Sequence, residues 1–548
     1  MSATAAQRMH RFRSPKTVIG RFVAKRTMRS AAIWAVAFGL IVASKAAGYA
    51  AAYPTLAART KLATSFSNNV GLEALFGVPH HIQTVSGFAV WNTLGVIALI
   101  GSVWAFLLAT KTFRGEEDAG RLELLLTGQT TAARAAANML TGIGVSLVVL
   151  YIIAASIFIA VGSLHTVHFG VSAALFFGLA VVSGATMFMS IGALTSQLMP
   201  TRSRAASLAA LIFGVSFLLR AMADTSTAHW VLNLTPLGWI ERLQPLNGSH
   251  SIWLLPIFGL ALICCTATVI LAARRDLGAS TFADKDSAAP HVRLLSKPLP
   301  LAVRLTRRSS ISWVIAIGLV ATFFGLLTNS AAQAFSDAGG ARHVLRNIAH
   351  AAQQTGAKTF LGIVFFILMT LTMVYVANAI GAVREEEAAG YLDNLLVRPV
   401  NRVKWLIGRI TILIGIVVLI AAVTTLGAWA GTASQHTNVP YHTLLMAGSN
   451  LLAPAVLIAG IGIAALGIIP RLTTLIAYTV IAWSFLIQIL SSGLNLSHWV
   501  LDTSIFQHVA LAPAVNPDWS SAAALVGIGI LLSLIGITAF NRRDLAAE

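Results

Sequence analysis

Residues 114–126 read RGEEDAGRLELLL, and this acidic stretch follows directly on a long apolar run. Residues 384–396 read REEEAAGYLDNLL and stand in the same place after another apolar run. The offset of about 270 residues is half of the 548-residue chain, which indicates an internal duplication. We call these stretches the acidic segments. They contain eight of the 19 carboxylates in the chain: Glu116, Glu117, Asp118, Glu123, Glu385, Glu386, Glu387 and Asp393.

The rest of the chain is strongly apolar. Hydrophobic residues make up 57% of the sequence and charged residues only 10%, against about a quarter in a soluble protein. Apolar runs of about twenty residues recur, and each is long enough to cross roughly 30 Å of hydrocarbon as a helix. Backbone groups in lipid must be hydrogen-bonded internally, and helices achieve this within one segment. The composition therefore predicts an all-α polytopic membrane protein.

We expect about twelve membrane-spanning helices, six in each half. An even number of crossings gives equivalent helices the same orientation, so the halves should be parallel repeats. The expected spans are 31–49, 88–110, 137–161, 171–193, 204–222, 251–272, 311–329, 359–381, 405–429, 443–468, 472–490 and 521–540. The expected domains are a basic N-terminal segment (1–30), a first six-helix half (31–273), a cytoplasmic linker (274–310) and a second six-helix half (311–548).

Further pairs of motifs support the duplication. Pro200 and Pro470 fall in the turn between the fourth and fifth spans of each half. Each half also ends on the same four residues, and an Arg–Ser pair followed by Trp stands at the start of the first span of each half. These pairs are Arg274–Arg275–Asp276–Leu277 with Arg542–Arg543–Asp544–Leu545, and Arg29–Ser30 before Trp34 with Arg308–Ser309 before Trp313.

The distribution of Lys and Arg predicts the orientation in the membrane. With both termini in the cytoplasm, the inner segments carry roughly thirty of these residues and the outer segments about eight, in accordance with the positive-inside rule. Both acidic segments then face the cytoplasm. The basic residues of 1–30 flank an apolar face of Val18, Ile19, Phe22 and Val23, which predicts an amphipathic helix at the membrane surface.

The acidic segments do not have the composition of a catalytic or metal site. Paired carboxylates can act as acid and base, but neither segment contains His or Cys, and carboxylates near a helix start are stabilised by the helix dipole. We therefore expect no catalytic residue and no metal. A leucine stripe at i, i+3 and i+4 recurs in both segments and predicts a short helix that docks into a groove of a partner. It consists of Leu122, Leu125 and Leu126, and of Leu392, Leu395 and Leu396.

The sequence also lacks an energy source of its own. No Gly-x-x-x-x-Gly-Lys-Ser/Thr loop is present to hold nucleotide phosphates. No Asp or Glu lies in the interior of an expected span, whereas ion-coupled transporters usually need such groups. We expect Lys45 and Arg220, near the outer ends of their spans, to be interface anchors. A transporter architecture without an internal motor indicates an external one.

The pattern Arg–x–Glu–Glu–x–x–Gly–x–Leu–Glu/Asp–x–Leu–Leu after a second span resembles the permease subunits of type-2 ABC exporters. The duplicated twelve-span form is similar to the polyketide-antibiotic (tetronasin-type) class, which includes mycobacterial multidrug-efflux permeases. This resemblance covers both halves. It implies that each acidic segment forms a coupling helix seated in a groove of an ATPase subunit. The two ATPase copies, and not this chain, would bind ATP and Mg, so the chain needs no cofactor.

The resemblance assigns roles to residues in two groups. The expected ATPase-docking residues are Glu116, Glu117, Gly120, Leu122 and Glu123, and Glu386, Glu387, Gly390, Leu392 and Asp393. The halves differ where Asp118 and Arg121 correspond to Ala388 and Tyr391. The resemblance also implies that the second and fifth spans line the substrate pathway. Their candidate residues are Phe88, Trp91, Trp104, Phe213, Phe217, Phe360, Phe366, Met369, Met373, Tyr375, Trp483 and Gln488.

We therefore expect an ATP-driven exporter of hydrophobic or amphipathic drugs or antibiotics, working by alternating access and conferring antibiotic resistance. Its expected partners are ATPase subunits, membrane lipid and small hydrophobic substrates, with no nucleic acid. The excess of Arg over Lys is typical of a bacterium with GC-rich DNA, so we expect the bacterial plasma membrane. Three alternatives stay open: an ion-coupled secondary drug transporter, an ABC permease for a lipid, and a polytopic membrane enzyme. The enzyme would need carboxylates or His gathered at one membrane face, and the outer candidates are His80 and His81 with Glu73.

Overall fold

A computed structural model shows a helical membrane protein. In the part of the chain that it describes, twelve helices are long and apolar enough to cross a membrane. This finding confirms the all-α polytopic architecture. The described residues are 18–66, 70–126, 130–276, 281, 294, 298–329, 332, 356–397, 400–437, 439–491 and 496–544.

The chain divides into two compact units. Unit 1 comprises residues 1–63 and 72–287, and unit 2 comprises residues 64–71 and 288–548. The long helices of unit 1 are α2 (Val18–Ala52), α5 (Val85–Thr112), α8 (Ala132–Gly162), α9 (Val171–Leu198), α10 (Arg202–Asp224) and α12 (Leu254–Arg274). Its short helices include α3 (Leu56–Phe66), α4 (Val70–Phe76), α6 (Arg114–Asp118), α7 (Arg121–Leu126), η3 (His229–Leu234) and α11 (Pro236–Arg242).

Unit 2 repeats this order of helices. Its long helices are α13 (Pro298–Leu326), α16 (Gly356–Ala388), α18 (Arg402–Ser434), α20 (Leu452–Ile468), α21 (Thr473–Ser491) and α23 (Trp519–Arg542). The short helix α19 (Tyr441–Asn450) precedes α20, α17 (Tyr391–Leu396) follows α16, and η6 (Ile505–His508) follows α21.

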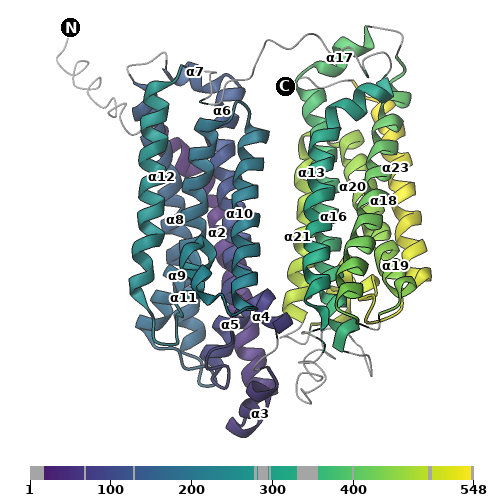
Figure 1. Ribbon diagram of the computed structural model, residues 1–548. Helices are drawn as coiled ribbons and strands as arrows, with labels where there is room; N and C mark the ends of the chain where they lie inside the picture. The colour runs from purple at the N-terminus through teal and green to yellow at the C-terminus, as the bar shows by residue number, and fades with distance from the viewer. Residues whose placement is uncertain are drawn as a thin grey trace, which may run out of the picture. The chain divides into compact units, whose positions relative to one another are not determined.

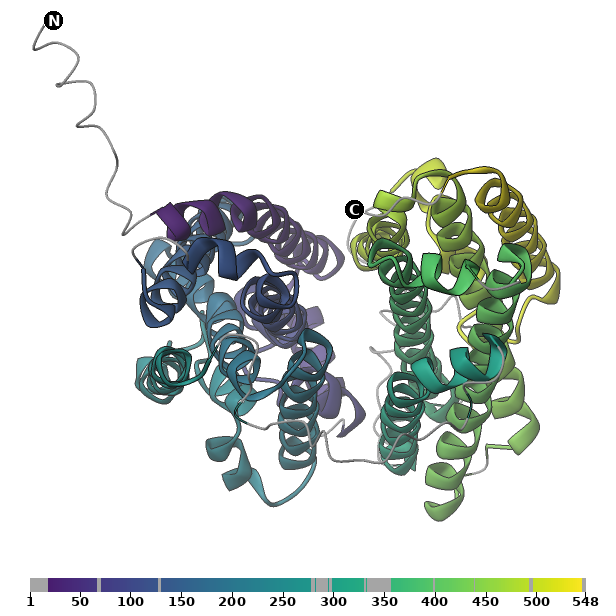
Figure 2. The same cartoon turned by 90° about the horizontal axis from the view of Figure 1, so that it is seen from above.

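The two units pair their helices in the same way (Figures 1 and 2). In unit 1, α2 packs along α8, α5 along α9, and α12 also contacts α9. In unit 2, the corresponding pairs are α13 with α18, α16 with α20, and α23 with α20. The tertiary contacts within each unit therefore agree with the internal duplication seen in the sequence.

Polar caps start several of these helices. Thr84 accepts a hydrogen bond from the amide of Gly87 at 2.9 Å at the start of α5, and Thr131 and Thr201 cap α8 and α10 in the same way. Asn401 caps α18 through the amides of Val403 and Lys404. Each cap supplies an acceptor to backbone donors that have no partner within the helix.

Glycines bring the backbones of α20 and α23 into contact. A Cβ on Gly460 would lie 2.2 Å from the carbonyl oxygen of Gly529, and one on Gly467 would lie 2.2 Å from that of Gly536. In lipid there is little hydrophobic drive between helices, so small residues that permit this close approach are typical of such interfaces.

Two helix starts differ from the expected ones. Helix α2 runs without a break from Val18, so residues 18–30 extend the first spanning helix instead of forming a separate surface helix. No proline interrupts α2, and Thr27 forms a 2.5 Å hydrogen bond with Ser146 of α8. Helix α13 begins at Pro298, inside the expected linker; proline is well tolerated in a first helical turn. Residues 1–17 lie outside the described residues.

The expected span 443–468 is divided into two helices at Leu451. Pro454 stands in the first turn of α20, where its missing N–H and its ring oppose continuation of the preceding helix. The short helices η3 and α11 lie between the fifth and sixth spans of unit 1.

Candidate functional site

Each acidic segment is a turn between a spanning helix and a short helix. In unit 1, α5 is followed by α6, and Gly120 with φ +69° leads into α7. In unit 2, α16 continues to Ala388, and Gly390 with φ +71° leads into α17. Left-handed φ angles are readily accessible only to glycine, which explains why both segments carry one at the same place. The short helices expected here are therefore present in both units.

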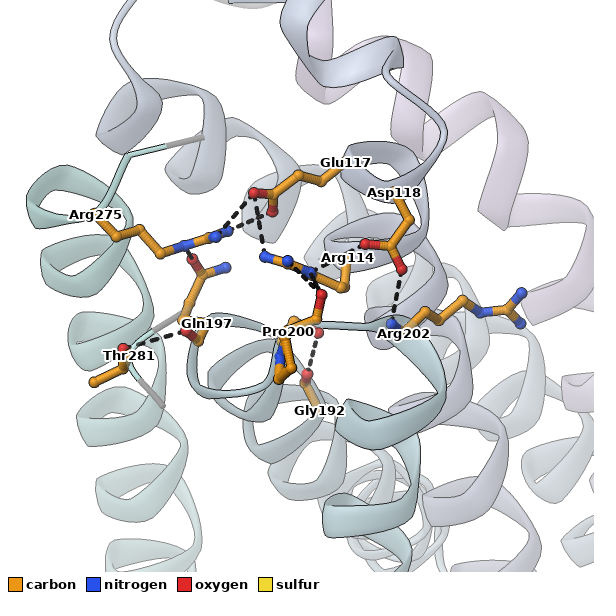
Figure 3. A network of polar contacts seen from close by, with 10 residues as sticks. Arg114, Glu117, Asp118, Gly192, Gln197, Pro200, Arg202, Arg275 and Thr281 are labelled. Carbon is orange, nitrogen blue, oxygen red and sulfur yellow. Dashed lines mark hydrogen bonds and ion pairs between the residues drawn. The ribbon is translucent and has the colours of Figure 1, made fainter. Parts of the chain in front are cut away.

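Glu117 is the centre of a buried ion-pair network in unit 1 (Figure 3). Its side chain is only 4% exposed. Its Oε1 lies 3.2 Å from Nη1 of Arg114 and accepts a hydrogen bond of 2.8 Å from Nη1 of Arg275, whose Nη2 also donates to Oε2. Arg275 follows directly on α12, so this pair ties the acidic segment to the end of the sixth span.

Glu387 has the equivalent partners in unit 2. Its two oxygens accept hydrogen bonds of 2.5 and 2.7 Å from Nη1 and Nη2 of Arg543, which follows directly on α23. Arg384 lies 3.7 Å away, as Arg114 does near Glu117. The two Arg–Arg–Asp motifs that end the halves thus supply the arginines that hold the acidic segments. We call the Glu117–Arg275 and Glu387–Arg543 pairs the arginine clamps.

The turn between the fourth and fifth spans is bound to the same network (Figure 3). Nε of Arg114 donates to the carbonyl oxygen of Pro200 at 3.0 Å, and Asp118 accepts a 2.8 Å hydrogen bond from the amide of Arg202. Nε of Arg275 donates to Oε1 of Gln197 at 2.7 Å. The second span, the turn between the fourth and fifth spans, and the end of the sixth span therefore meet at one acidic segment.

The neighbouring glutamates have different partners in the two units. Glu116 pairs with Arg26 of α2 at 2.5 Å and with Arg121 of α7 at 2.6 Å. Glu386 instead pairs with Arg409 of α18. Unit 2 has Tyr391 where unit 1 has Arg121, so α17 cannot provide the same ion pair. This difference gives the two segments unequal surfaces.

In unit 2 the leucine stripe packs against its own unit, and docking of the stripe into a partner stays a prediction. Leu392 is 1% exposed and packs in a cluster with Trp405, Leu406, Leu466 and Phe540. Leu395 and Leu396 pack against this cluster, and Leu122 of unit 1 is also buried. Burial of the stripe removes apolar surface from the aqueous end of the helix bundle and holds α17 onto its own unit.

The exposed face of the short helices combines polar, aromatic and aliphatic side chains. In α7 it includes Arg121, Glu123 and Leu124, and Leu124 is 73% exposed. In α17 it includes Tyr391, Asp393 and Asn394, followed by Val397. The hydrogen bond from Arg121 to Glu116 raises the pKa of the guanidinium above its ordinary value, so this group stays charged. Of the expected docking carboxylates, Glu123 and Asp393 are the exposed ones.

Four of the expected pathway residues line cavities. Trp91 lines a cavity of unit 1 among α5, α10 and α11. Phe366, Met369 and Gln488 line a cavity of unit 2 between α16 and α21. Both cavities lie between the second and fifth spans of their unit, near the end opposite to the acidic segment.

Other expected pathway residues have contacts within their unit. Phe88 stacks on Tyr49 with ring centroids 4.0 Å apart, and Met373 is fully buried. The remaining contacts are Trp104 with Ser30, Phe213 with Phe188, Phe217 with Arg220, Phe360 with Phe324, Tyr375 with Ser310, and Trp483 with Thr503. These contacts stabilise the helix packing, and a role in transport stays a prediction for all twelve residues.

Arg220 is not the interface anchor that we expected. It is 4% exposed and lies 3.6 Å from both Asp224 and Glu241. The spacing of four residues between Arg220 and Asp224 places them on one helix face, a signal that could have identified this pair. Glu241 could not have been assigned in the same way, because it comes from a different helix.

Comparison with known proteins agrees with this architecture. Residues 295–541 match the family model described as the C-terminal domain of the multidrug efflux system permease Rv1217c. The chain is 26% identical over 505 residues to the multidrug efflux system permease protein Rv1217c of Mycobacterium tuberculosis, covering 90% of this chain and 88% of the relative. The chain is therefore, along nine-tenths of its length, a relative of this mycobacterial permease, and its second half matches that permease's C-terminal domain.

Proposed function

We propose that this chain is the membrane-spanning permease subunit of an ATP-driven ABC exporter that moves hydrophobic and amphipathic drugs out of a bacterial cell. The observation that carries the proposal is the pair of short helices α7 and α17, each following an acidic residue held by an arginine clamp and each exposing a carboxylate. The printed name of the relative, a multidrug efflux system permease, supports drugs as the substrate class.

The energy comes from two copies of a separate ATPase subunit, which bind ATP and Mg. Each copy docks on one short helix, and the exposed Glu123 and Asp393 lie on the docking faces. Basic rims on the ATPase grooves would complement these carboxylates. The chain itself catalyses no reaction.

The arginine clamps transmit the movement of the ATPase subunits. A force on α7 reaches α5 through α6, and it reaches α12 through Glu117 of α6 and Arg275. A force on α17 reaches α16 directly and α23 through Glu387 and Arg543. Because each clamp joins the second span to the sixth, the helices of one unit move together. Rocking of such units is the usual basis of alternating access. In this proposal, both termini and both short helices face the cytoplasm of a cell bounded by the plasma membrane.

The test distinguishes a loss of ATPase docking from a loss of folding. The double variant Glu123→Lys/Asp393→Lys is co-expressed with ATP-binding-cassette ATPases of the same genome, and co-purification, drug-stimulated ATP hydrolysis and drug export are measured. We expect all three to fall to background while the melting temperature of the chain stays unchanged, because both carboxylates are exposed. Asp502→Lys is the control, since Asp502 is exposed and far from either acidic segment in sequence. Normal co-purification and export by the double variant would disprove the docking role.

A reconstitution assay distinguishes the proposed ABC exporter from an ion-coupled transporter. The chain is reconstituted alone in vesicles and given either ATP or a pH gradient. We expect no transport under either condition until the ATPase is added. Transport by the lone chain that an uncoupler abolishes would identify a secondary transporter instead.

A further inference from the structure

The cavity of unit 1 has a composition suited to a ligand. Its empty volume is about 580 Å³ when the open solvent at its mouth is included. Phe76 and Trp91 form an aromatic wall, with ring centroids 5.5 Å apart, and Leu237 and Ile240 of α11 add apolar surface. The indole N–H of Trp91 donates to the carbonyl oxygen of Gly77 at 2.8 Å, which fixes the ring at the wall.

A buried charged cluster lies at this cavity. Arg220 and Glu241 line it, and Asp224 is 2% exposed directly beside Arg220. Arg220 Nε lies 3.6 Å from Asp224 Oδ2, and its Nη1 lies 3.6 Å from Glu241 Oε2. Two carboxylates thus face one guanidinium. Since Arg220 can neutralise only one of them, the cluster carries an excess negative charge when both are ionised.

Several polar atoms of this cluster are buried without a hydrogen-bond partner among the described residues, and three of them are carboxylate oxygens. Nη2 of Arg220 donates to the backbone oxygens of Ala74 at 2.8 Å and Leu75 at 3.3 Å, so the guanidinium is held by its own unit. Both carboxylate oxygens of Asp224 and Oε2 of Glu241 are buried and accept no hydrogen bond from the described residues. Buried acceptors without a donor are costly, and buried charges are usually compensated.

His80 and Glu73, two titratable groups near the cluster, do not supply this compensation. Burial lowers the pKa of His80, which also lines the cavity, so its imidazole is neutral at pH 7. Burial raises the pKa of Glu73, and the charge of Glu241 contributes to the same shift.

The cavity of unit 2 has no such cluster. Its empty volume is about 290 Å³, and its lining consists of apolar residues, backbone and Gln488. Leu361 and Leu490 occupy the positions that correspond to Trp91 and Arg220. The negative charge is therefore a specific property of the unit 1 cavity and not a consequence of the repeated fold.

We propose that the unit 1 cavity binds an amphipathic organic cation, with Glu241 facing the positive charge and Trp91 and Phe76 contacting its apolar part. Arg220 lies 3.6 Å from each of the two carboxylates, and of these two only Glu241 lines the cavity. Aromatic faces also attract cations, and an apolar pocket with few polar groups is typical of small-molecule sites. This inference rests on the proposed function, since it names the class of drug that the exporter takes.

The test uses two probes of the same shape and opposite charge, tetraphenylphosphonium and tetraphenylborate. Binding of each to the purified chain in lipid nanodiscs is measured by equilibrium dialysis, so no ATPase is needed. We expect saturable binding of tetraphenylphosphonium only. Glu241→Gln should weaken it about tenfold or more, because it removes one full charge at the cavity. The control Asp502→Asn, at an exposed carboxylate of unit 2, should bind normally.

A second variant tests the site independently if Glu241→Gln does not fold. Trp91→Leu introduces the residue found at the matching position of unit 2, and we expect weaker phosphonium binding with little change in melting temperature. Glu241→Asp keeps the charge and should retain part of the affinity. Equal binding of both probes, preference for tetraphenylborate, or unchanged affinity in folded Glu241→Gln would overturn the proposal.

The cation site and the exporter function can each be rejected without rejecting the other. Export of neutral drugs driven by ATP, without phosphonium binding at this cavity, would reject the cation site and keep the exporter. Phosphonium binding that depends on Glu241, in a chain that never exports with any ATPase, would keep the site and reject the exporter.

Discussion

Glu387 and Arg543 are 156 residues apart in the chain, yet their charged groups meet in two hydrogen bonds of 2.5 and 2.7 Å. Glu117 and Arg275 form the equivalent pair in unit 1. Each pair closes the aqueous end of its unit by joining the second span to the sixth. The acidic segments are therefore integral parts of the units, and only their outer faces are free to meet a partner.

The clamp of unit 2 should contribute strongly to stability. We expect Glu387→Gln to lower the free energy of unfolding by about 3 kcal/mol, because it leaves the charge of Arg543 uncompensated in a largely buried site. Thermal unfolding in detergent measures this. The control Glu385→Gln, at an exposed neighbour, should change stability little. The reversed pair Glu387→Arg/Arg543→Glu should regain part of the loss, and no recovery would argue against a direct pair.

The buried leucine of α17 gives a second prediction. We expect Leu392→Ala to cost about 2–5 kcal/mol, since truncation opens a cavity among Trp405, Leu406 and Phe540. Leu124→Ala is the matched control, because Leu124 is 73% exposed on the corresponding short helix. Protease cleavage within 384–400 should rise in Leu392→Ala and not in Leu124→Ala. Equal behaviour of the two variants would contradict inward packing of the stripe.

The glycine before α17 should be sensitive to substitution. Gly390 has φ +71°, and we expect Gly390→Ala to cost about 1 kcal/mol because a Cβ is strained in this region. Gly390→Asn should cost less, since asparagine adopts left-handed φ more readily. The unmodified chain and the variants Gly390→Ala and Gly390→Asn are compared by melting temperature and ATPase stimulation. A ranking with alanine more stable than asparagine would contradict the turn described here.

The contact between α20 and α23 provides the fourth prediction. A Cβ on Gly467 would lie 2.2 Å from the carbonyl oxygen of Gly536, so Gly467→Ala should force the helices apart and lower the melting temperature. On α23, a Cβ at Gly527 meets nothing within 4 Å. Gly527→Ala should be neutral or stabilising, because alanine favours the helix. Similar losses in both variants would contradict close packing of the backbones at Gly467 as the reason for its sensitivity.

Local sequence determined the helices of this protein. A run of about twenty apolar residues carries its own tendency to span a membrane, so all twelve spans were predictable, as was the duplication marked by Gly120 and Gly390. Helix ends were predicted less well: the starts of α2 and α13 depend on packing as well as on composition. Thr27 of α2, for example, is held by Ser146 of another helix.

Only the tertiary structure decided which groups meet. The sequence showed that Glu117 and Arg275 are repeated as Glu387 and Arg543, but not that each glutamate pairs with its arginine. Nor did it show that Leu392 faces inward, because a stripe on a short helix fits a partner as well as its own unit. The cluster at Arg220 likewise forms across separate helices. Such contacts depend on which helices become neighbours, and this depends on packing between residues far apart in the sequence. The formation of each helix depends mainly on the residues within it.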